Sequence, residues 1–302
     1  MKSKVLVTGG TGFIGRHVIN SLRAAGWSVI ATRRSQSLVN TNCADKDIVW
    51  WNIEKLGLDS LFNEYHEEIG AIIHIATAYD HQTGGEFKLF RTNVAFPMDI
   101  LNQAILHKVE LFINTDTFFN SLKVQYDHQH FYTLSKRHFF EWGKKIAESE
   151  NIKFLNLVLH HVYGHGDAEN KFISHLSRAC LKGDEVKMTE GSQKRDFVYI
   201  KDVADAYLKV LENTIFSNTT GFKSFDIGTG HSISLREFSE RLNNVFGNRA
   251  HLRFGVLPFR KGEAEECKAD VSAITSIGWR PKYSLEKGLQ EMFNNFNEEL
   301  GL

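Results

Sequence analysis

Cysteine and proline are scarce in this sequence, which has three of each among 302 residues. The cysteines, Cys43, Cys180 and Cys267, are odd in number and widely spaced. This pattern excludes a disulfide framework and a cysteine-rich metal site, and it indicates reduced thiols that are buried or incidental. Because the chain also lacks a Gly/Ser-rich linker, we expect no point at which it divides cleanly into independent domains.

Long apolar runs and an excess of one charge are absent as well. No segment approaches the roughly 20 apolar residues that a membrane-spanning helix needs, and no signal-peptide pattern precedes the first strand pattern at residues 4–8. The 36 basic residues balance the 36 acidic ones, which argues against nucleic acid or an anionic membrane as a partner. We therefore expect a soluble, cytoplasmic protein.

Short apolar, β-branched runs alternate with helical patterns in the first half of the chain. The runs lie at residues 5–7, 29–31, 48–51, 71–75, 111–113 and 154–159. Between the first two, Ile14, Val18 and Leu22 recur every four residues, as on one face of a helix, and Gly26 stands where that helix would end. This alternation predicts an α/β fold with a doubly wound parallel sheet.

The strongest motif is Thr8-Gly9-Gly10-Thr11-Gly12-Phe13-Ile14-Gly15, placed between the first strand and the first helix. Glycines at 9, 12 and 15 allow a tight turn, a close approach to a pyrophosphate, and close packing of helix on sheet. We therefore predict a Rossmann-type dinucleotide-binding lobe at residues 1–165, with returning segments near 196–232. A smaller mixed α/β lobe, mainly residues 166–302 and interleaved with the first, should bind the substrate.

The second half of the chain is less regular than the first. It predicts helices near residues 172–181, 202–211, 235–246 and 285–296, strands near 186–188 and 197–200, and a strand that ends at 227.

Arg33 and Arg34 follow the second strand, where an acidic residue usually accepts a hydrogen bond from the ribose 2′-hydroxyl of NAD. Two arginines there would instead pair with a 2′-phosphate through charge-assisted hydrogen bonds. The pair favours NADP(H) over NAD(H). The alternative is an ordinary pair of solvated surface arginines.

Tyr132 and Lys136 lie four residues apart, on one face of a predicted helix. A lysine near a tyrosine lowers the pKa of the phenol, so that the phenol can exchange a proton near neutral pH. Tyr283 and Lys287 repeat the spacing, but they lie far from any strand end that would face the cofactor. We interpret this second pair as chance.

Histidines and aromatic residues offer weaker candidates. His160 and His161 are adjacent, so their side chains would point to opposite sides of a strand, and we expect no metal site. Phe139, Phe140 and Trp142 fit a core or dimer-interface stripe better than a cofactor wall.

These motifs occur in an order that resembles the extended NAD(P)-dependent epimerase/dehydratase family of short-chain dehydrogenases/reductases. The matching segments cover nearly the whole chain: the glycine motif, His74-Ile75-Ala76, Asn93-Val94, Thr115 before Tyr132 and Lys136, His161-Val162-Tyr163-Gly164, Arg195-Asp196-Phe197, residues 226–230, Arg260-Lys261-Gly262-Glu263, and residues 278–281. Residues 114–119, 166–172 and 195–199 look like the branch of CDP-abequose and CDP-paratose synthases. That branch reduces the 4-keto group of a nucleotide-linked deoxysugar for bacterial surface polysaccharide, the O-antigen of lipopolysaccharide.

The resemblance implies a role for each matching residue. Thr115 and Tyr132 would contact the sugar carbonyl, Lys136 the cofactor ribose, and Asp116 a sugar hydroxyl. Cofactor contacts would come from Gly9, Thr11, Gly12, Phe13, Ile14, Gly15, Arg33, Arg34, Asn52, Ile53, Ala76, Asn93, Tyr132 and Lys136. Substrate contacts would come from Thr77, Tyr79, Thr117, His161, Lys171, Phe172, Arg195 and Arg260, with the two arginines on the diphosphate.

Three departures from the family pattern bear on the reaction. Thr117 stands where sugar-nucleotide 4,6-dehydratases carry the glutamate that removes the C5 proton, so dehydration loses its base. Asn52 replaces an aspartate near the adenine, and His165 replaces a proline. We expect a homodimeric, NADPH-dependent 4-ketoreductase acting on a CDP- or dTDP-linked 4-dehydro-6-deoxyglucose type of sugar. The alternatives are a nucleotide-sugar 4-epimerase and a non-catalytic dinucleotide-binding sensor or scaffold.

Overall fold

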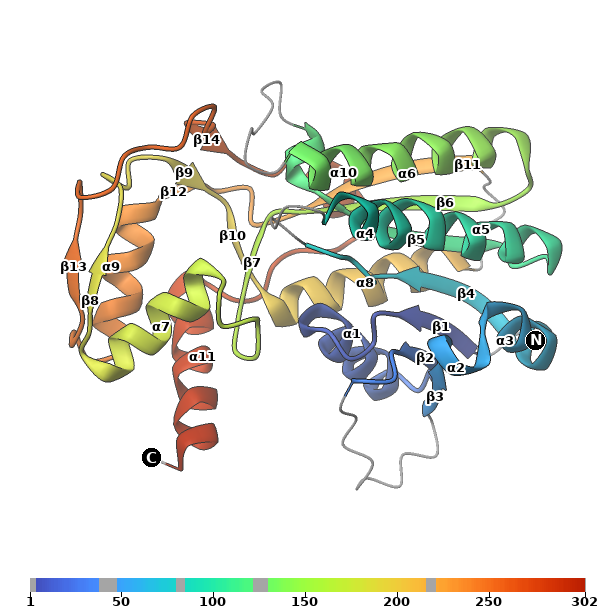
Figure 1. The fold of residues 1–302 in the computed structure, drawn as a ribbon, viewed down its shortest axis with the longest axis horizontal. Coiled ribbons are helices and arrows are strands. Elements are labelled where there is room, and N and C mark those ends of the chain that lie inside the picture. Colours follow the sequence, from blue (N-terminus) through green and yellow to red (C-terminus); the bar gives the residue numbers. More distant parts are fainter. Residues whose placement is uncertain (1–3, 38–47, 80–84, 122–129, 216–220, 302) are drawn as a thin grey trace.

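The structure is a computed structural model that describes residues 4–37, 48–79, 85–121, 130–215 and 221–301. A seven-stranded parallel sheet forms the larger lobe, at the right of Figure 1, in the order β11-β6-β5-β4-β1-β2-β3. Its strands are β1 (Lys4–Thr8), β2 (Ser28–Arg33), β3 (Ile48–Asn52), β4 (Ile69–His74), β5 (Leu111–Thr117), β6 (Lys153–Leu159) and β11 (Gly221–Ile227). Because all seven are parallel, their carboxyl ends share one edge of the sheet.

Helices cover both faces of this sheet. One face carries α1 (Phe13–Ala24) and α8 (Ile200–Ile215), and the other carries α3 (Leu58–Tyr65), α5 (Phe96–Leu106) and α6 (His130–Ser149). Short elements complete the lobe: α2 (Ile53–Leu56), α4 (Glu86–Phe90), a π-helical turn (Arg91–Ala95) and a 3₁₀ turn (Phe118–Ser121). Successive strand residues alternate between faces, so that Val5 and Val7 join the α1/α8 core and Leu6 joins the other.

The smaller lobe lies at the left of Figure 1 and is built from short strands and helices. Its helices are α7 (Phe172–Lys182), α9 (Leu235–Val245) and α11 (Leu285–Leu300), whereas α10 (Ser272–Ser276) packs on β11 of the large lobe. Its strands are β7 (His161–Tyr163), β8 (Glu185–Lys187), β9 (Lys194–Arg195), β10 (Phe197–Tyr199), β12 (Ile233–Ser234), β13 (His251–Arg253) and β14 (Glu266–Cys267). Between these segments, α8 and β11 return to the large lobe, where β11 is an edge strand.

The predicted α/β class and parallel Rossmann-type sheet are confirmed. One strand is longer than expected: β5 continues to Thr117 because Asn114 and Asp116, polar side chains inside the sheet, both hydrogen-bond Asn156 on β6. Cys180 and Cys267 are free and buried, whereas Cys43 lies outside the described residues. No helix in the described ranges is long and apolar enough to cross a membrane.

Candidate active site

The glycine motif forms a close-packed turn between β1 and α1. Gly9 has φ +70°, and a Cβ on it would lie 2.7 Å from the backbone nitrogen of Ala76. A Cβ on Gly15 would collide with the Gly9 carbonyl, whereas Gly12 is exposed and would meet only that carbonyl, at 3.3 Å. α1 begins at Phe13 with no side-chain cap and no acidic residue in its first turn. Its free N–H groups therefore suit an anion, and the turn fits a dinucleotide pyrophosphate.

The segments that follow β2 and β3 carry charges of both signs. Arg33 is half-buried at the end of β2 and Arg34 is exposed. The Ser35 backbone N–H donates to Glu54 Oε2 at 2.7 Å, and this bond holds the pKa of the Glu54 carboxyl below its usual value. Asn52, predicted to contact the cofactor, caps α2 by accepting from the Lys55 N–H. Glu54, a carboxylate near Arg34, was missed because it follows the next strand, β3.

Tyr132 and Lys136 lie on the first turns of α6. Lys136 is 3% exposed, and burial lowers its pKa from 10.5 to about 8 although the Asp116 carboxylate favours the charged form. The pKa of Tyr132 is raised, first by burial and then by Tyr79 and Asp116, while a side-chain hydrogen bond from Thr117 lowers it. Our expectation that the phenol pKa falls is therefore wrong for this structure. At neutral pH the Tyr132 phenol is protonated, and it can donate a proton.

The Thr115 hydroxyl has two protein partners in this structure, and its predicted contact with the sugar carbonyl stays a prediction. Its Oγ1 is 2.7 Å from the His74 carbonyl oxygen and 2.6 Å from Tyr207 Oη, in a buried contact with α8. The β5 hydroxyl that reaches Tyr132 is Thr117, two residues further on. Sequence order alone could not separate these two threonines.

Asp116 and Asn93 are positioning residues in this structure. Asp116 accepts from the Thr117 N–H at 2.8 Å, from Asn120 Nδ2 at 2.7 Å and from Asn156 Nδ2 at 3.0 Å. These three hydrogen bonds occupy the carboxylate that we expected to contact a sugar hydroxyl. The Asn93 amide bonds both the N–H and the carbonyl of Ala78, and it donates to Ser135 on α6. It is 1% exposed and orients the segment at Ala78 against α6, and its predicted contact with the cofactor stays a prediction.

The residues predicted to bind substrate line the carboxyl edge of the sheet and the facing segments of the small lobe. Tyr79 is exposed, with its ring 4.6 Å from that of Tyr132, and Thr77 donates to the Ile75 carbonyl. The His161 ring lies 4.6 Å from that of Phe118, and its buried Nδ1 has no partner among the described residues. In the segment that leads into α7, Lys171 Nζ forms an ion pair with Asp167 Oδ1 at 3.0 Å, and Phe172 is exposed.

The two predicted diphosphate ligands differ in their surroundings. Arg260 is exposed, whereas Arg195 is 3% exposed and donates to the carbonyls of Lys194 and Ala264, with Nη2 3.0 Å from Glu263. Arg195 is therefore held by the segment that carries Glu263. A contact of either arginine with a diphosphate stays a prediction.

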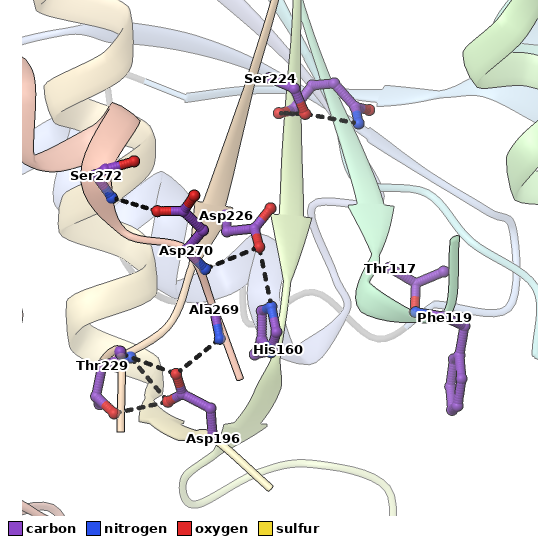
Figure 2. Close-up of polar contacts among 12 residues, drawn as sticks. Thr117, Phe119, His160, Asp196, Ser224, Asp226, Thr229, Ala269, Asp270 and Ser272 are labelled. Carbon is purple, nitrogen blue, oxygen red and sulfur yellow. Dashed lines mark hydrogen bonds and ion pairs between the residues drawn. The ribbon is translucent and has the colours of Figure 1, made fainter. Parts of the chain in front are cut away.

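The Asp196 carboxylate links the small lobe to the carboxyl edge of the sheet through hydrogen bonds. Its carboxylate accepts from the Thr229 backbone and hydroxyl, from Gly230, and from Ala269 (Figure 2). Nearby, Asp226 at the end of β11 lies 3.4 Å from His160 Nε2 and accepts from Asp270. Three segments distant in sequence are thus fixed beside the carboxyl ends of β6 and β11.

The other candidates lie outside this site. Tyr283 immediately precedes α11, its ring packed on Tyr199 at 4.8 Å and under Lys287 at 4.4 Å, in the small lobe. Phe139 is core, whereas Trp142 is 60% exposed. Within the described ranges, no group of three or more His, Cys, Asp or Glu residues could hold a metal ion.

Comparison with known proteins agrees with this arrangement. Residues 5–228 match the NAD dependent epimerase/dehydratase family, and the chain belongs to that family. It is 36% identical to CDP-abequose synthase from Salmonella typhimurium over 97% of this chain and 98% of that one, and 34% identical to CDP-abequose synthase from Salmonella muenchen with the same coverage.

Among solved structures, UDP-glucose 4-epimerase from Thermotoga maritima, with UDP-glucose, has a TM-score of 0.82 at 24% identity, covering 98% of this chain and 99% of that one. The Thermus thermophilus UDP-glucose 4-epimerase, in complex with NAD, has a TM-score of 0.80 at 22% identity, covering 97% and 99%. These two likenesses concern the fold. Together with the family match, the relatives make this protein an NAD(P)-dependent enzyme that acts on nucleotide sugars.

Proposed function

We propose that this protein is an NADPH-dependent reductase of the 4-keto group of a nucleotide-linked 6-deoxy or 3,6-dideoxy hexose. Its substrate would be a CDP- or dTDP-linked sugar of the 4-dehydro-6-deoxyglucose type, and its product would serve bacterial O-antigen synthesis in the cytoplasm. Two relatives named CDP-abequose synthase, similar over nearly the whole chain, support the deoxysugar assignment.

The observation that carries the proposal is the state of Tyr132. Burial and the neighbouring Asp116 keep the phenol protonated, and a hydroxyl, Thr117, contacts it. A protonated phenol donates to a developing alkoxide, which is the proton transfer that carbonyl reduction needs. Thr117 offers no base for removing a C5 proton, and the adjacent Asp116 is held by three donors.

Each part of the cofactor has residues suited to it. The N-terminus of α1 and the glycine turn would bind the pyrophosphate, Arg33 and Arg34 the 2′-phosphate, and Lys136 the nicotinamide ribose. When bound, NADPH supplies a hydride to C4 of the sugar. Tyr132 then donates its proton to the sugar oxygen, and Lys136 balances the charge that is left on the phenol.

A homodimer is part of the proposal. The helices α4, α5 and α6 lie on one side of the sheet (Figure 1) and leave Phe87, Phe90, Leu106, Phe131 and Trp142 half or more exposed. Apolar side chains gathered on neighbouring helices are typical of a subunit interface. A second copy of the chain would cover them.

The test is a substrate screen. Purified protein is mixed with NADPH and either CDP- or dTDP-4-keto-6-deoxyglucose, freshly made, while NADPH absorbance is recorded and the sugar product is identified by NMR. We expect NADPH to be consumed and a 4-hydroxy sugar to form with one of the two carriers. Binding of NADPH without turnover of either sugar would instead support a sensor or scaffold.

A further inference from the structure

The turn after β2 already holds an anion that belongs to the protein itself. β2, the edge strand β3 and α2 pack together at one end of the sheet (Figure 1). Arg33 on β2 pairs with Asn52 on β3, so Ser35 and Glu54, each two residues further along, come together. The Ser35 backbone N–H donates to Glu54 Oε2 at 2.7 Å. The Ser35 hydroxyl is also engaged, 3.4 Å from Asn52 Oδ1 and 3.3 Å from Asn52 Nδ2.

This turn is linked directly to the glycine turn that suits a pyrophosphate. Thr11 Oγ1, in the glycine turn, donates to Ser37 Oγ at 3.3 Å. In a dinucleotide bound to such a glycine turn, the adenosine ribose reaches the end of the second strand. Ser35 and Glu54 are both exposed there, within reach of a ligand. A 2′-phosphate on that ribose would therefore meet the Ser35 N–H, the donor that Glu54 already occupies.

We propose that Glu54 sets the cofactor selectivity of this protein by competing with the 2′-phosphate of NADP(H) for the Ser35 N–H, an inference that rests on the proposed cofactor site. One N–H donates one strong hydrogen bond, and two anions at the same donor would repel each other. NADP(H) must therefore displace the Glu54 carboxylate. NAD(H), which has a neutral hydroxyl in place of the phosphate, leaves the carboxylate where it is.

The charges around Glu54 fit a competitor for the phosphate. Hydrogen bonds from Ser35, and then the positive charge of Arg34, hold the pKa of the Glu54 carboxyl below its usual value, so it is ionised at neutral pH. Arg34 thus interacts favourably with Glu54 before any cofactor binds, and part of its attraction for a 2′-phosphate is offset. The arginine pair therefore gives a smaller preference for NADP(H) than its two charges alone would provide.

The test measures binding of NADP⁺ and NAD⁺ to the full-length protein by isothermal titration calorimetry, with no sugar present. Glu54→Gln keeps the length of the side chain and a hydrogen-bond acceptor, but it removes the charge. We expect it to tighten NADP⁺ binding by roughly 5- to 20-fold and to change NAD⁺ binding by less than about twofold. Raising the salt concentration should reduce the gain, because exposed charges are screened.

Matched probes and variants isolate the effect of the 2′-phosphate. Adenosine 2′,5′-bisphosphate and 5′-AMP differ only in that phosphate, so they should reproduce the difference between NADP⁺ and NAD⁺. Glu54→Ala, which removes the acceptor as well, should tighten NADP⁺ binding at least as much as Glu54→Gln. Glu67→Gln removes the same charge from an exposed residue just before β4, at the amino-terminal edge of the sheet, and should leave both affinities unchanged.

Unchanged NADP⁺ affinity in both Glu54 variants would overturn the proposal. Weaker NAD⁺ binding by Glu54→Gln would overturn it as well, because it would mean that Glu54 accepts a hydrogen bond from the ribose hydroxyl. Failure of the unmodified protein to reduce either sugar nucleotide would overturn the proposed function. The titrations contain no sugar, so that failure would leave the role of Glu54 intact.

Discussion

Lys136 costs this protein stability, and replacing it with methionine should therefore raise Tm while abolishing turnover. The pKa of the buried ammonium is lowered from 10.5 to about 8, which corresponds to about 3 kcal/mol against the charged form in the folded state. Removing the charge also removes its attraction to Asp116, but that carboxylate keeps three hydrogen-bond donors. We expect a net gain of about 1–3 kcal/mol for Lys136→Met, or roughly 2–6 °C in Tm at pH 7.

The pH dependence distinguishes this effect from a general improvement in packing. Because the folded pKa lies below the unfolded one, the unfolded chain binds more protons between pH 8 and 10.5, and the unmodified protein gains stability as pH rises through that range. Below pH 8 the folded protein carries the full free-energy cost of burying the charged Lys136 side chain. The difference in Tm between Lys136→Met and the unmodified protein should therefore be largest near pH 7 and shrink toward pH 10.

Calorimetry or thermal melting monitored by circular dichroism checks this prediction. Lys145, on the same helix with a side chain 75% exposed, provides the control, and Lys145→Met should change Tm by about 1 °C or less. The reasoning is refuted if Lys136→Met melts below the unmodified protein at pH 7, or if the difference between them does not change with pH. Either result would mean that the Asp116–Lys136 attraction outweighs burial.

Three further predictions concern the proton donor, the cofactor site and the dimer. Tyr132→Phe should reduce kcat by roughly 100-fold or more with NADPH binding nearly intact, whereas Tyr283→Phe should have almost no effect; equal effects would mean that the wrong Tyr-Lys pair was chosen. Changing Arg33 and Arg34 together to Ala should raise the apparent NADPH constant at least tenfold for each lost contact, at about 1.5–3 kcal/mol each. Equal use of NADH and NADPH by the unmodified protein, in steady-state assays, contradicts that site. Trp142→Glu should shift the protein toward monomer in light scattering, and an unchanged mass would place the interface elsewhere.

Features that depend on neighbouring residues could be predicted from the sequence. The glycine turn, the amphipathic α1 and the Tyr132–Lys136 spacing each follow from a few consecutive residues, so strand, turn and helix fall where they were expected. The parallel sheet follows from the alternation of such units. Several residues assigned to the cofactor therefore follow the carboxyl ends of the strands, and their contacts with a cofactor stay a prediction.

Features that depend on distant partners could not be predicted. The Thr115 hydroxyl is hydrogen-bonded with Tyr207, 92 residues away, and Arg195 is held by Glu263, 68 residues away. The raised pKa of Tyr132 comes first from burial in the folded chain and then from Tyr79 and Asp116. The amide of Asn93 is oriented by a π-helical turn, which the sequence of residues 91–95 does not predict. In each case tertiary packing decides the direction or the protonation of the side chain.

The ratio of sugar converted to NADPH oxidised tests the central claim most directly. Purified protein is incubated with a 4-keto-6-deoxysugar nucleotide and limiting NADPH, the product is counted by NMR, and cofactor oxidation is followed by absorbance. A reductase that uses Tyr132 as its proton donor consumes one NADPH for each sugar reduced, so we predict a ratio near one. An epimerase returns the hydride to the sugar within each cycle, so many sugars converted per NADPH, or conversion without added NADPH, would contradict the account.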